Sequence, residues 1–305
     1  MDSNNEKAGS SKFYCTMLRA HGLVFTKLRI FLFKTHHSKT LLSSLHPSRC
    51  LQGMAEVSSP SSSAFTEPTK DDVIARLRQT DAADMLAGLP PLPTSVPRAA
   101  VLVPLFYRNS QLHVLLTVRS SNLSSHRGEV AFPGGKSDEG DADLRETALR
   151  ESEEEIGLAR DRVEIISQLS SVFARRGTLV VPFVGFIPED FDPVPNPEEV
   201  QDVFTVPFAT FLQSSEDHKQ RVWTDSGQEF LLDFFTHYQD GKQITTFGLT
   251  AIICITAASI CFGRSPDFES LIKFDSSNPR KIHEISKKSY MRQVRKYEKA
   301  KQGNL

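Results

Sequence analysis

Five stretches of the chain are rich in the β-branched and aromatic residues typical of strands. The first two, 98–107 (RAAVLVPLFY) and 111–120 (QLHVLLTVRS), are separated by three residues, a spacing short enough for a hairpin. The other three predict strands at 162–174 (RVEIISQLSSVFA), 177–187 (GTLVVPFVGFI) and 229–238 (EFLLDFFTHY). The middle of the chain therefore holds enough strand-forming sequence for a sheet.

Apolar residues at helical spacing occur before and between these strands. Residues 70–89 begin with acidic residues and continue with apolar positions near helical spacing, which predicts a helix. Residues 141–155 also look helical, and Gly157 directly after them is a candidate C-cap. A short helix is expected at 207–213 (PFATFLQ). The apolar run 249–262 predicts a buried helix or a pair of strands.

Composition divides the chain into four parts. Residues 1–66 form a polar, basic segment, and residues 67–94 combine a helix with the stiff, proline-rich LPPLPTSVP. Residues 95–272 hold the expected strands, and residues 273–305 form a basic tail whose cations recur at roughly helical intervals. We expect one α/β domain over 95–272 without internal repeats, followed by a solvated helical tail.

The bulk numbers exclude several classes of protein. A formal net charge of −1 argues against a general nucleic-acid binder, which would carry a basic excess. The longest apolar run has fourteen residues, whereas a membrane-spanning helix needs about 20, so no membrane span is expected. The cysteines form no CxxC pair and indicate a reducing compartment: Cys15, Cys50, Cys254 and Cys261.

Residues 1–66 have the bias of an organellar transit peptide or of a disordered tail. They contain twelve serines and eight Lys or Arg but only three acidic residues. We expect an organellar address, with the chloroplast preferred over the mitochondrion because of the serine content. Met54 would start a shorter cytosolic form.

Acidic residues are concentrated near the end of the helix expected at 141–155. Glu151 and Glu155 are four residues apart and therefore lie on one face, and Glu154 lies alongside. Like charges at this spacing oppose a helix by a few tenths of a kcal/mol each. A divalent cation such as Mg²⁺, which prefers oxygen ligands and shares its shell with phosphates, would relieve the repulsion.

Residues 132–158, FPGGKSDEGDADLRETALRESEEEIGL, resemble the Nudix box. The matching positions are Gly135, Arg150, Glu151, Glu154, Glu155, Gly157 and Leu158. The interval from Gly135 to Arg150 is one residue longer than in the general box, so Asp141 or Asp143 must replace its spaced glutamate. The resemblance implies a Nudix fold, a mixed β-sheet sandwiched between helices, with a loop–helix–loop that carries the glutamates.

The preceding stretch 115–135, LLTVRSSNLSSHRGEVAFPGG, is similar to the signature of the coenzyme A diphosphatase branch of Nudix hydrolases. The longer box is usual in that branch, and the downstream PNPEEVQDVFTVPFATFL and FGLTA resemble its plant organellar members. The resemblance implies Mg²⁺- or Mn²⁺-dependent hydrolysis of coenzyme A or its thioesters. The products would be 3′,5′-ADP and (acyl-)4′-phosphopantetheine.

The resemblance also implies roles for individual residues. Glu151 and Glu155 are the expected metal ligands, and Glu154 is a third ligand or the base that activates water. Glu199, in the loop PNPEEV, is a rival for the base. Arg150, which is flanked by acids, is expected to orient the glutamates.

Three residues upstream of the box are candidates for binding the substrate. Arg119 and Arg127 carry guanidinium groups, which bind phosphate bidentately, although either is equally compatible with a surface ion pair. His126 precedes a glycine turn, where it either reaches the diphosphate or caps the loop.

Other functions fit parts of this pattern. A Nudix hydrolase of NADH or ADP-ribose would share the metal helix but not the upstream signature. A hydrolase of damaged nucleoside triphosphates is a second alternative, and a non-catalytic nucleotide-binding Nudix module is a third, which the intact glutamates disfavour. A homodimer is compatible with the sequence, which leaves the oligomeric state open.

Overall fold

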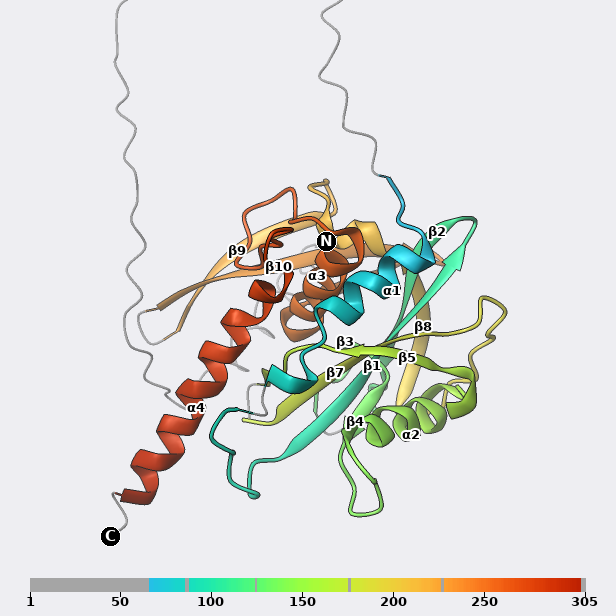
Figure 1. The fold of residues 1–305 in the computed structure, drawn as a ribbon. Coiled ribbons are helices and arrows are strands. Elements are labelled where there is room, and N and C mark those ends of the chain that lie inside the picture. The colour runs from blue at the N-terminus through green and yellow to red at the C-terminus, as the bar shows by residue number, and fades with distance from the viewer. Residues whose placement is uncertain (1–65, 86–87, 124, 175–176, 226–227, 303–305) are drawn as a thin grey trace, which may run out of the picture. The chain divides into compact units, whose positions relative to one another are not determined.

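The computed structural model describes residues 66–85, 88–123, 125–174, 177–225 and 228–302 (Figure 1). The expected transit peptide and Met54 lie outside these residues. Contacts divide the chain into a larger unit, residues 65–221 with 231–305, and a smaller one, residues 1–64 with 222–230. The site described below belongs to the larger unit, as does the fold apart from residues 222–230.

The central sheet is built around the expected hairpin. Strand β1 (Arg98–Arg108) pairs antiparallel with β2 (Gln111–Arg119), with Arg108 opposite Gln111. The two turn residues, Asn109 and Ser110, have φ of 50° and 62°, the left-handed conformation that tight two-residue hairpins require. Strand β7 (Leu179–Phe186) lies parallel to β1, so the sheet is mixed.

Further strands extend the sheet on both sides. β3 (Val130–Ala131) and β8 (Val200–Pro207) pair with β2, and β4 (Gly134–Lys136) pairs with β1. The single strand expected at 162–174 is divided into β5 (Glu164–Gln168) and β6 (Val172–Phe173), both paired with β7. Pro182 of β7 explains the break. Its carbonyl accepts a hydrogen bond from Leu169 at 2.8 Å, but a proline has no N–H to return one.

A second, antiparallel sheet contains β9 (His218–Asp225), β10 (Gln228–Gln239) and β11 (Lys242–Phe247). The pattern at 229–238 predicted β10. The sequences of β9 (HKQRVWTD) and β11 (KQITTF) are too polar to be recognised as strands on their own.

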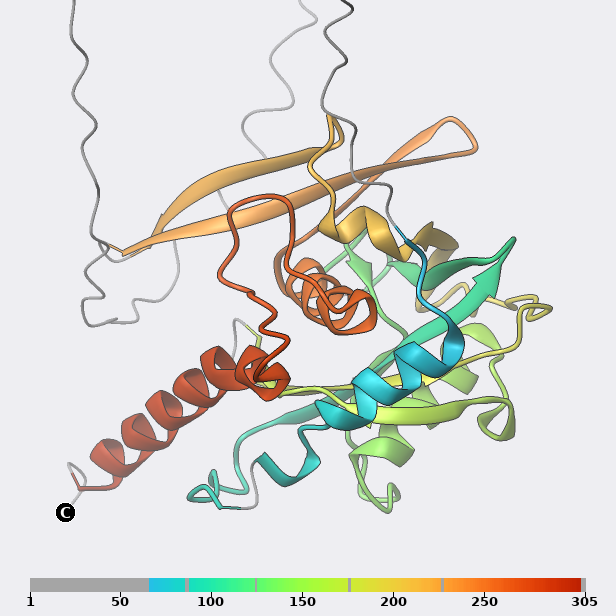
Figure 2. The ribbon, with the colours of Figure 1, turned by 45° about the horizontal axis from the view of Figure 1, so that its top comes forward.

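Helices cover both faces of the central sheet, as expected for the Nudix fold (Figures 1 and 2). Along β1, Ala100 and Leu102 point into a core shared with α2 (Leu144–Ile156). Val103 and Leu105 point into the opposite core, which includes α1 (Lys70–Gln79) and α3 (Gly248–Phe262). Successive residues of a strand face opposite sides, so a strand buried on both sides is apolar throughout.

The remaining helices are mostly short. The pattern at 70–89 gives α1, which Thr80 caps, and the 3₁₀ turn η2 (Ala83–Met85). Three more 3₁₀ helices follow: η3 (Arg160–Arg162), η4 (Phe208–Leu212) and η5 (Pro279–His283). The run 249–262 is the buried helix α3 rather than two strands. Among the described residues, no helix is both long enough and apolar enough to cross a membrane.

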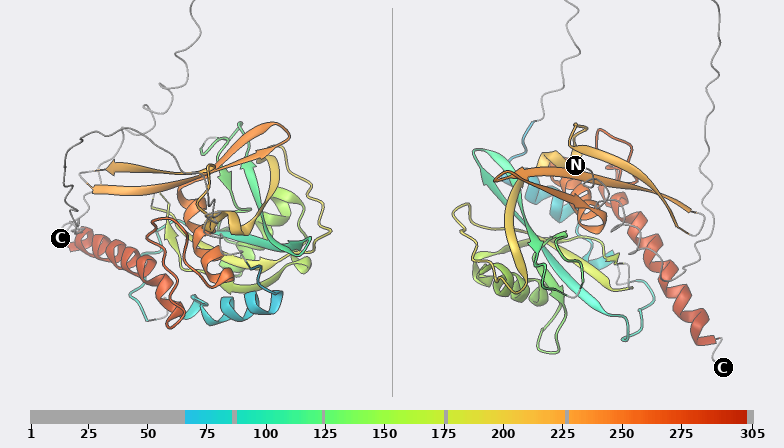
Figure 3. Two further views of the ribbon diagram at one scale, coloured as in Figure 1. Left: turned by 90° about the horizontal axis from the view of Figure 1, so that it is seen from above. Right: turned by 180° about the vertical axis from the view of Figure 1, so that it is seen from behind.

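The last helix, α4 (Glu284–Gln302), occupies most of the basic tail (Figure 3). It buries Tyr290 and Val294 beside Leu92 and Val96. Just before this helix, the buried His283 forms a hydrogen bond from its Nε2 to the Thr80 carbonyl at 2.6 Å. Segments on both sides of 95–272 thus contribute buried side chains, and the domain boundaries at 95 and 272 stay a prediction.

Candidate active site

Two consecutive glycines let the loop FPGG pass close beneath α2. Gly134 has φ of 147°, and a Cβ there would lie 2.3 Å from the carbonyl oxygen of Ala100. A Cβ on Gly135 would lie 2.4 Å from the carboxylate of Glu151. Only glycine therefore fits at these positions without displacing the strand or the carboxylate.

Local sequence determines both ends of α2. The Asp143 carboxylate accepts the backbone N–H of Glu146 at 2.8 Å, an N-cap that satisfies one of the free donors of the first turn. Gly157 ends the helix at φ 71°, as expected for a left-handed C-cap. The buried hydroxyl of Ser152 donates to the Ala148 carbonyl at 2.7 Å. Both ends of α2, the helix that carries the glutamates, are thus capped.

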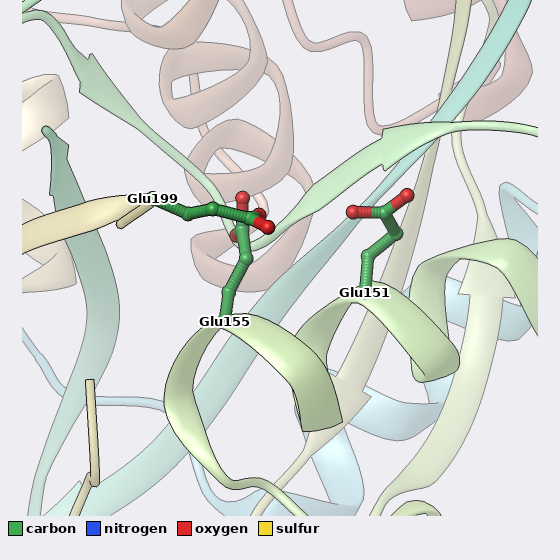
Figure 4. Close-up of side chains that lie close together, drawn as sticks. All are labelled: Glu151, Glu155 and Glu199. Carbon is green, nitrogen blue, oxygen red and sulfur yellow. The ribbon is translucent and has the colours of Figure 1, made fainter. Parts of the chain in front are cut away.

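Three carboxylates converge at the open side of α2 (Figure 4). Glu151 and Glu155 project from the helix, and Glu199 reaches toward them from the residue before β8. One oxygen from each of the three carboxylates lies within 4.8 Å of the other two. Glu151, Glu155 and Glu199 are called the glutamate cluster below.

Backbone hydrogen bonds hold Glu199 beside a helix that ends more than forty residues earlier. The N–H of Asn196 donates to the carbonyl of Glu155 at 2.9 Å, and the N–H of Ser120 donates to the carbonyl of Glu199 at 2.8 Å. The pairing of β2 with β8 is irregular between Val118 and Arg119. Such irregularities re-aim side chains near active sites, and this one brings Arg119 and Glu199 to the same end of the sheet.

Glu155 is the most buried carboxylate of the cluster, with 3% of its surface exposed. Burial raises its pKa to about 8, and the charges of Glu151 and Glu199 act in the same direction. The Gly134 N–H at 3.1 Å and the Arg119 guanidinium at 3.8 Å oppose this rise. Burial also raises the pKa of Glu151. Without a cation, burial and mutual repulsion therefore oppose ionisation of these two carboxyl groups.

Arg150 ties the cluster to the loop before α2. Its guanidinium contacts Asp141 at 2.8 Å, Glu151 at 3.0 Å and Glu154 at 2.9 Å. The hydrogen bonds from Arg150 hold the pKa of Asp141 well below its usual range. Asp141 is therefore a partner of Arg150, whereas Asp143 caps the helix.

The structure separates the other predicted residues from the cluster to different degrees. The Glu154 carboxylate forms an ion pair with Arg150 and is about half exposed. It is not one of the three clustered carboxylates. His126 and Arg127 lie in the loop between β2 and β3, and their hydrogen bonds stay within it: His126 pairs with Glu129 at 2.8 Å, and Arg127 donates to the Leu123 carbonyl. Arg119 is the predicted substrate-binding residue that contacts the cluster.

Sequence patterns did not reveal the contact between the Gly134 N–H and Glu155. The double glycine in FPGG was the sequence feature that could have indicated this contact, because glycines often mark close backbone approach. The cluster itself has the oxygen ligands that a hard divalent cation prefers, namely three carboxylates. Beside it, the buried Nε of Arg119 has no hydrogen-bond partner.

Comparison with known proteins gives the family. The NUDIX domain model matches residues 96–226. The chain is 38% identical to peroxisomal coenzyme A diphosphatase NUDT7 of Mus musculus, over 67% of this chain and 84% of that protein. It is 41% identical to the mitochondrial Nudix hydrolase 15 of Arabidopsis thaliana, over 56% of this chain and 61% of that protein. It is 37% identical to the chloroplastic Nudix hydrolase 22 of the same plant, over 68% of this chain and 70% of that protein.

These matches confirm the resemblance carried by residues 115–158, and they agree with the mixed sheet and its covering helices. Nudix hydrolases generally use divalent metal ions, which the glutamate cluster suits. The chain belongs to the Nudix hydrolase family and is a hydrolase that acts on diphosphate bonds.

Proposed function

We propose that this hydrolase cleaves the diphosphate linkage of coenzyme A or its thioesters with Mg²⁺ or Mn²⁺. The products are 3′,5′-ADP and 4′-phosphopantetheine, which keeps any acyl group. The observation that carries the proposal is the convergence of Glu151, Glu155 and Glu199 beside Arg119, at the end of the coenzyme A-type signature 115–135. The coenzyme A diphosphatase name of the mouse relative supports the choice of substrate.

In this proposal the glutamate cluster holds the cation. When bound, such a cation neutralises phosphate charge and lowers the pKa of a water molecule. Arg119, next to Glu155, contacts a phosphate of the substrate, and His126 and Arg127 reach the substrate from the loop between β2 and β3. Arg150 orients Glu151 and Glu154 through the contacts described above.

The base that activates water is Glu199 or Glu154. Glu199 lies in the cluster, and Glu154 is held on Arg150 at its edge. Gln variants of each, titrated with Mg²⁺, distinguish the two roles. Loss of a ligand raises the metal concentration required, whereas loss of the base lowers kcat at saturating metal and changes its pH profile.

Substrate preference tests the proposal directly. Free coenzyme A, acyl thioesters, NADH and ADP-ribose are assayed with Mg²⁺ and with Mn²⁺. We expect the highest kcat/KM for coenzyme A or a thioester. A preference for NADH or ADP-ribose would overturn the coenzyme A assignment, and no turnover of any diphosphate would favour a binding module.

The homodimer stays a prediction.

An organellar location is part of the proposal. The relatives are named as peroxisomal, mitochondrial and chloroplastic proteins, and residues 1–66 have the bias of a transit peptide. We favour the chloroplast over the mitochondrion, with a shorter cytosolic form that starts at Met54. Fusing residues 1–66 to a fluorescent reporter tests this, and a cytosolic reporter would refute the targeting role.

A further inference from the structure

Positive charge is concentrated in α4. The helix contains seven Lys or Arg and two Glu, a net charge of +5. The whole chain has a net charge of −1, so the other 286 residues together carry −6. The C-terminal helix is therefore a cationic element, as is the basic segment 1–66, and the residues between them carry an acidic excess.

The cations of α4 lie on the face opposite its buried side. Tyr290 and Val294 anchor the helix, and the Tyr290 hydroxyl donates to the Pro90 carbonyl at 3.2 Å. On the other face, exposed cations follow one another at intervals of four, three and four residues. We call this exposed row the basic stripe: Lys288, Arg292, Arg295 and Lys299, with Lys296 beside them.

Lys288 shows how weakly an ion pair within the helix neutralises a cation of the stripe. The Lys288 ammonium lies 3.9 Å from the Glu284 carboxylate, and 75% of the Lys288 side chain is exposed. An ion pair this exposed is weak and is screened by salt. Lys288 thus keeps its charge exposed to solvent, and Arg295, Lys296 and Lys299 are exposed as well.

An open apolar pocket, lined by residues of both α3 and α4, lies at the N-terminal end of α4. Its volume is about 190 Å³, and its walls include Leu249, Ile252, Ile272 and Ile285. A cavity of about 150 Å³ with similar walls holds benzene, so this one has room for an apolar group of about six carbons. Ile285 lies on the exposed side of α4 with 41% of its surface exposed, and Leu271, next to Ile272, is 68% exposed.

We propose that the basic stripe and this pocket form a docking surface for a membrane that contains anionic lipids. Clusters of four to eight Lys or Arg bind anionic headgroups, each adding roughly a fivefold factor to affinity. The neighbouring apolar residues suit the acyl region just below those headgroups. Single-stranded nucleic acid is the poorer partner, because it uses aromatic residues among the cations for base stacking. The tyrosines of α4, Tyr290 and Tyr297, instead pack against the core on the other side of the helix.

Vesicle binding tests the surface in the full-length protein. Sedimentation with vesicles of phosphatidylcholine containing 30% phosphatidylserine is compared with pure phosphatidylcholine. We expect salt-sensitive binding to the anionic vesicles. The triple variant Lys288→Gln, Arg295→Gln, Lys299→Gln should bind on the order of a hundredfold more weakly. The matched control removes three exposed cations elsewhere: Arg78→Gln, Arg162→Gln and Lys219→Gln. It should retain most of the affinity.

A second pair of changes tests the apolar part. Ile285→Ser with Leu271→Ser should weaken vesicle binding severalfold while leaving its salt dependence unchanged. All variants should keep the hydrolytic rate of the parent protein, because none of these positions belongs to the glutamate cluster. The stripe variant and its control should also keep its melting temperature, because the side chains they change are exposed. Equal binding of the stripe variant and its control would overturn the proposal. So would equal binding to neutral vesicles, or tighter binding to an oligonucleotide than to anionic vesicles.

Discussion

At the scale of single residues, Glu155 shows how burial and charge are balanced in the site. It is enclosed, it accepts a hydrogen bond from the Gly134 N–H, and it lies beside Arg119, yet its pKa rises to about 8. Without metal at pH 7, its carboxyl group is therefore mostly protonated, a form that glutamine resembles. A substitution that is harmless to the fold can thus be damaging to metal binding.

We expect Glu155→Gln to lower kcat at least about a hundredfold, the loss typical of a positioned catalytic group. The metal-free melting temperature should stay about the same, because a largely protonated carboxyl group is replaced by a neutral amide of similar shape. Steady-state assays and melting curves with and without Mg²⁺ measure both effects.

Glu153→Gln is the matched control. Glu153 is two residues away on the same helix, where it pairs with Arg160 at 2.8 Å on the surface. It should retain nearly full activity. Normal turnover by Glu155→Gln, or equal damage from both changes, would contradict the metal-binding role of the helix.

At the scale of elements, the site depends on how closely β4 passes α2. Gly135 has no side chain, and the carboxylate of Glu151 occupies the space that a Cβ would need. Since that carboxylate is the far end of a flexible side chain, it can move without disturbing the helix. The contact between strand and helix therefore controls the position of a proposed ligand more than it controls stability.

Gly135→Ala should raise the Mg²⁺ concentration needed for half-maximal activity about tenfold or more. Its melting temperature should change by only a few degrees, which corresponds to about 1 kcal/mol or less. Gly140→Ala is the control, because a Cβ there meets nothing within 4 Å. A Gly135→Ala protein with the parent's metal requirement would show that the position of Glu151 is not set by this contact.

At the scale of the whole molecule, buried histidines connect stability to pH. Burial lowers the pKa of His113, His237 and His283, and that of His237 falls to about 4. The unfolded chain, with histidine pKa values near 6.5, takes up these protons first as the pH falls. The contribution of these histidines to stability is therefore complete above about pH 6.5 and declines toward pH 4. The raised pKa of Glu155 acts in the opposite direction, because ionising this buried carboxyl group lowers stability as the pH rises toward about 8.

For His237 alone, the loss between pH 7 and pH 5 should be about 2 kcal/mol. His237→Gln should be less stable than the parent at pH 7, because the Nε2 contact to the Thr246 hydroxyl at 3.0 Å changes. It should also have a flatter dependence on pH between 7 and 5. Urea unfolding at several pH values measures both, and parallel pH profiles for the two proteins would contradict this role.

Local sequence determined most of the elements that carry the site. The caps at Asp143 and Gly157, the spacing of Glu151 and Glu155, and the apolar strands β1, β2 and β7 are short-range patterns, because each depends on neighbours within a few residues. The same holds for the Nudix box, since its glutamates belong to one helix.

Only the tertiary structure decided which distant groups join that helix. Glu199 reaches Glu155 because β8 pairs with β2 in one register, and Arg119 arrives through the same irregular pairing. The division of the expected strand into β5 and β6, and the polar strands β9 and β11, also depend on partners far away in the chain. Pairing register and burial arise from contacts between remote segments, and no local pattern of residues encodes them.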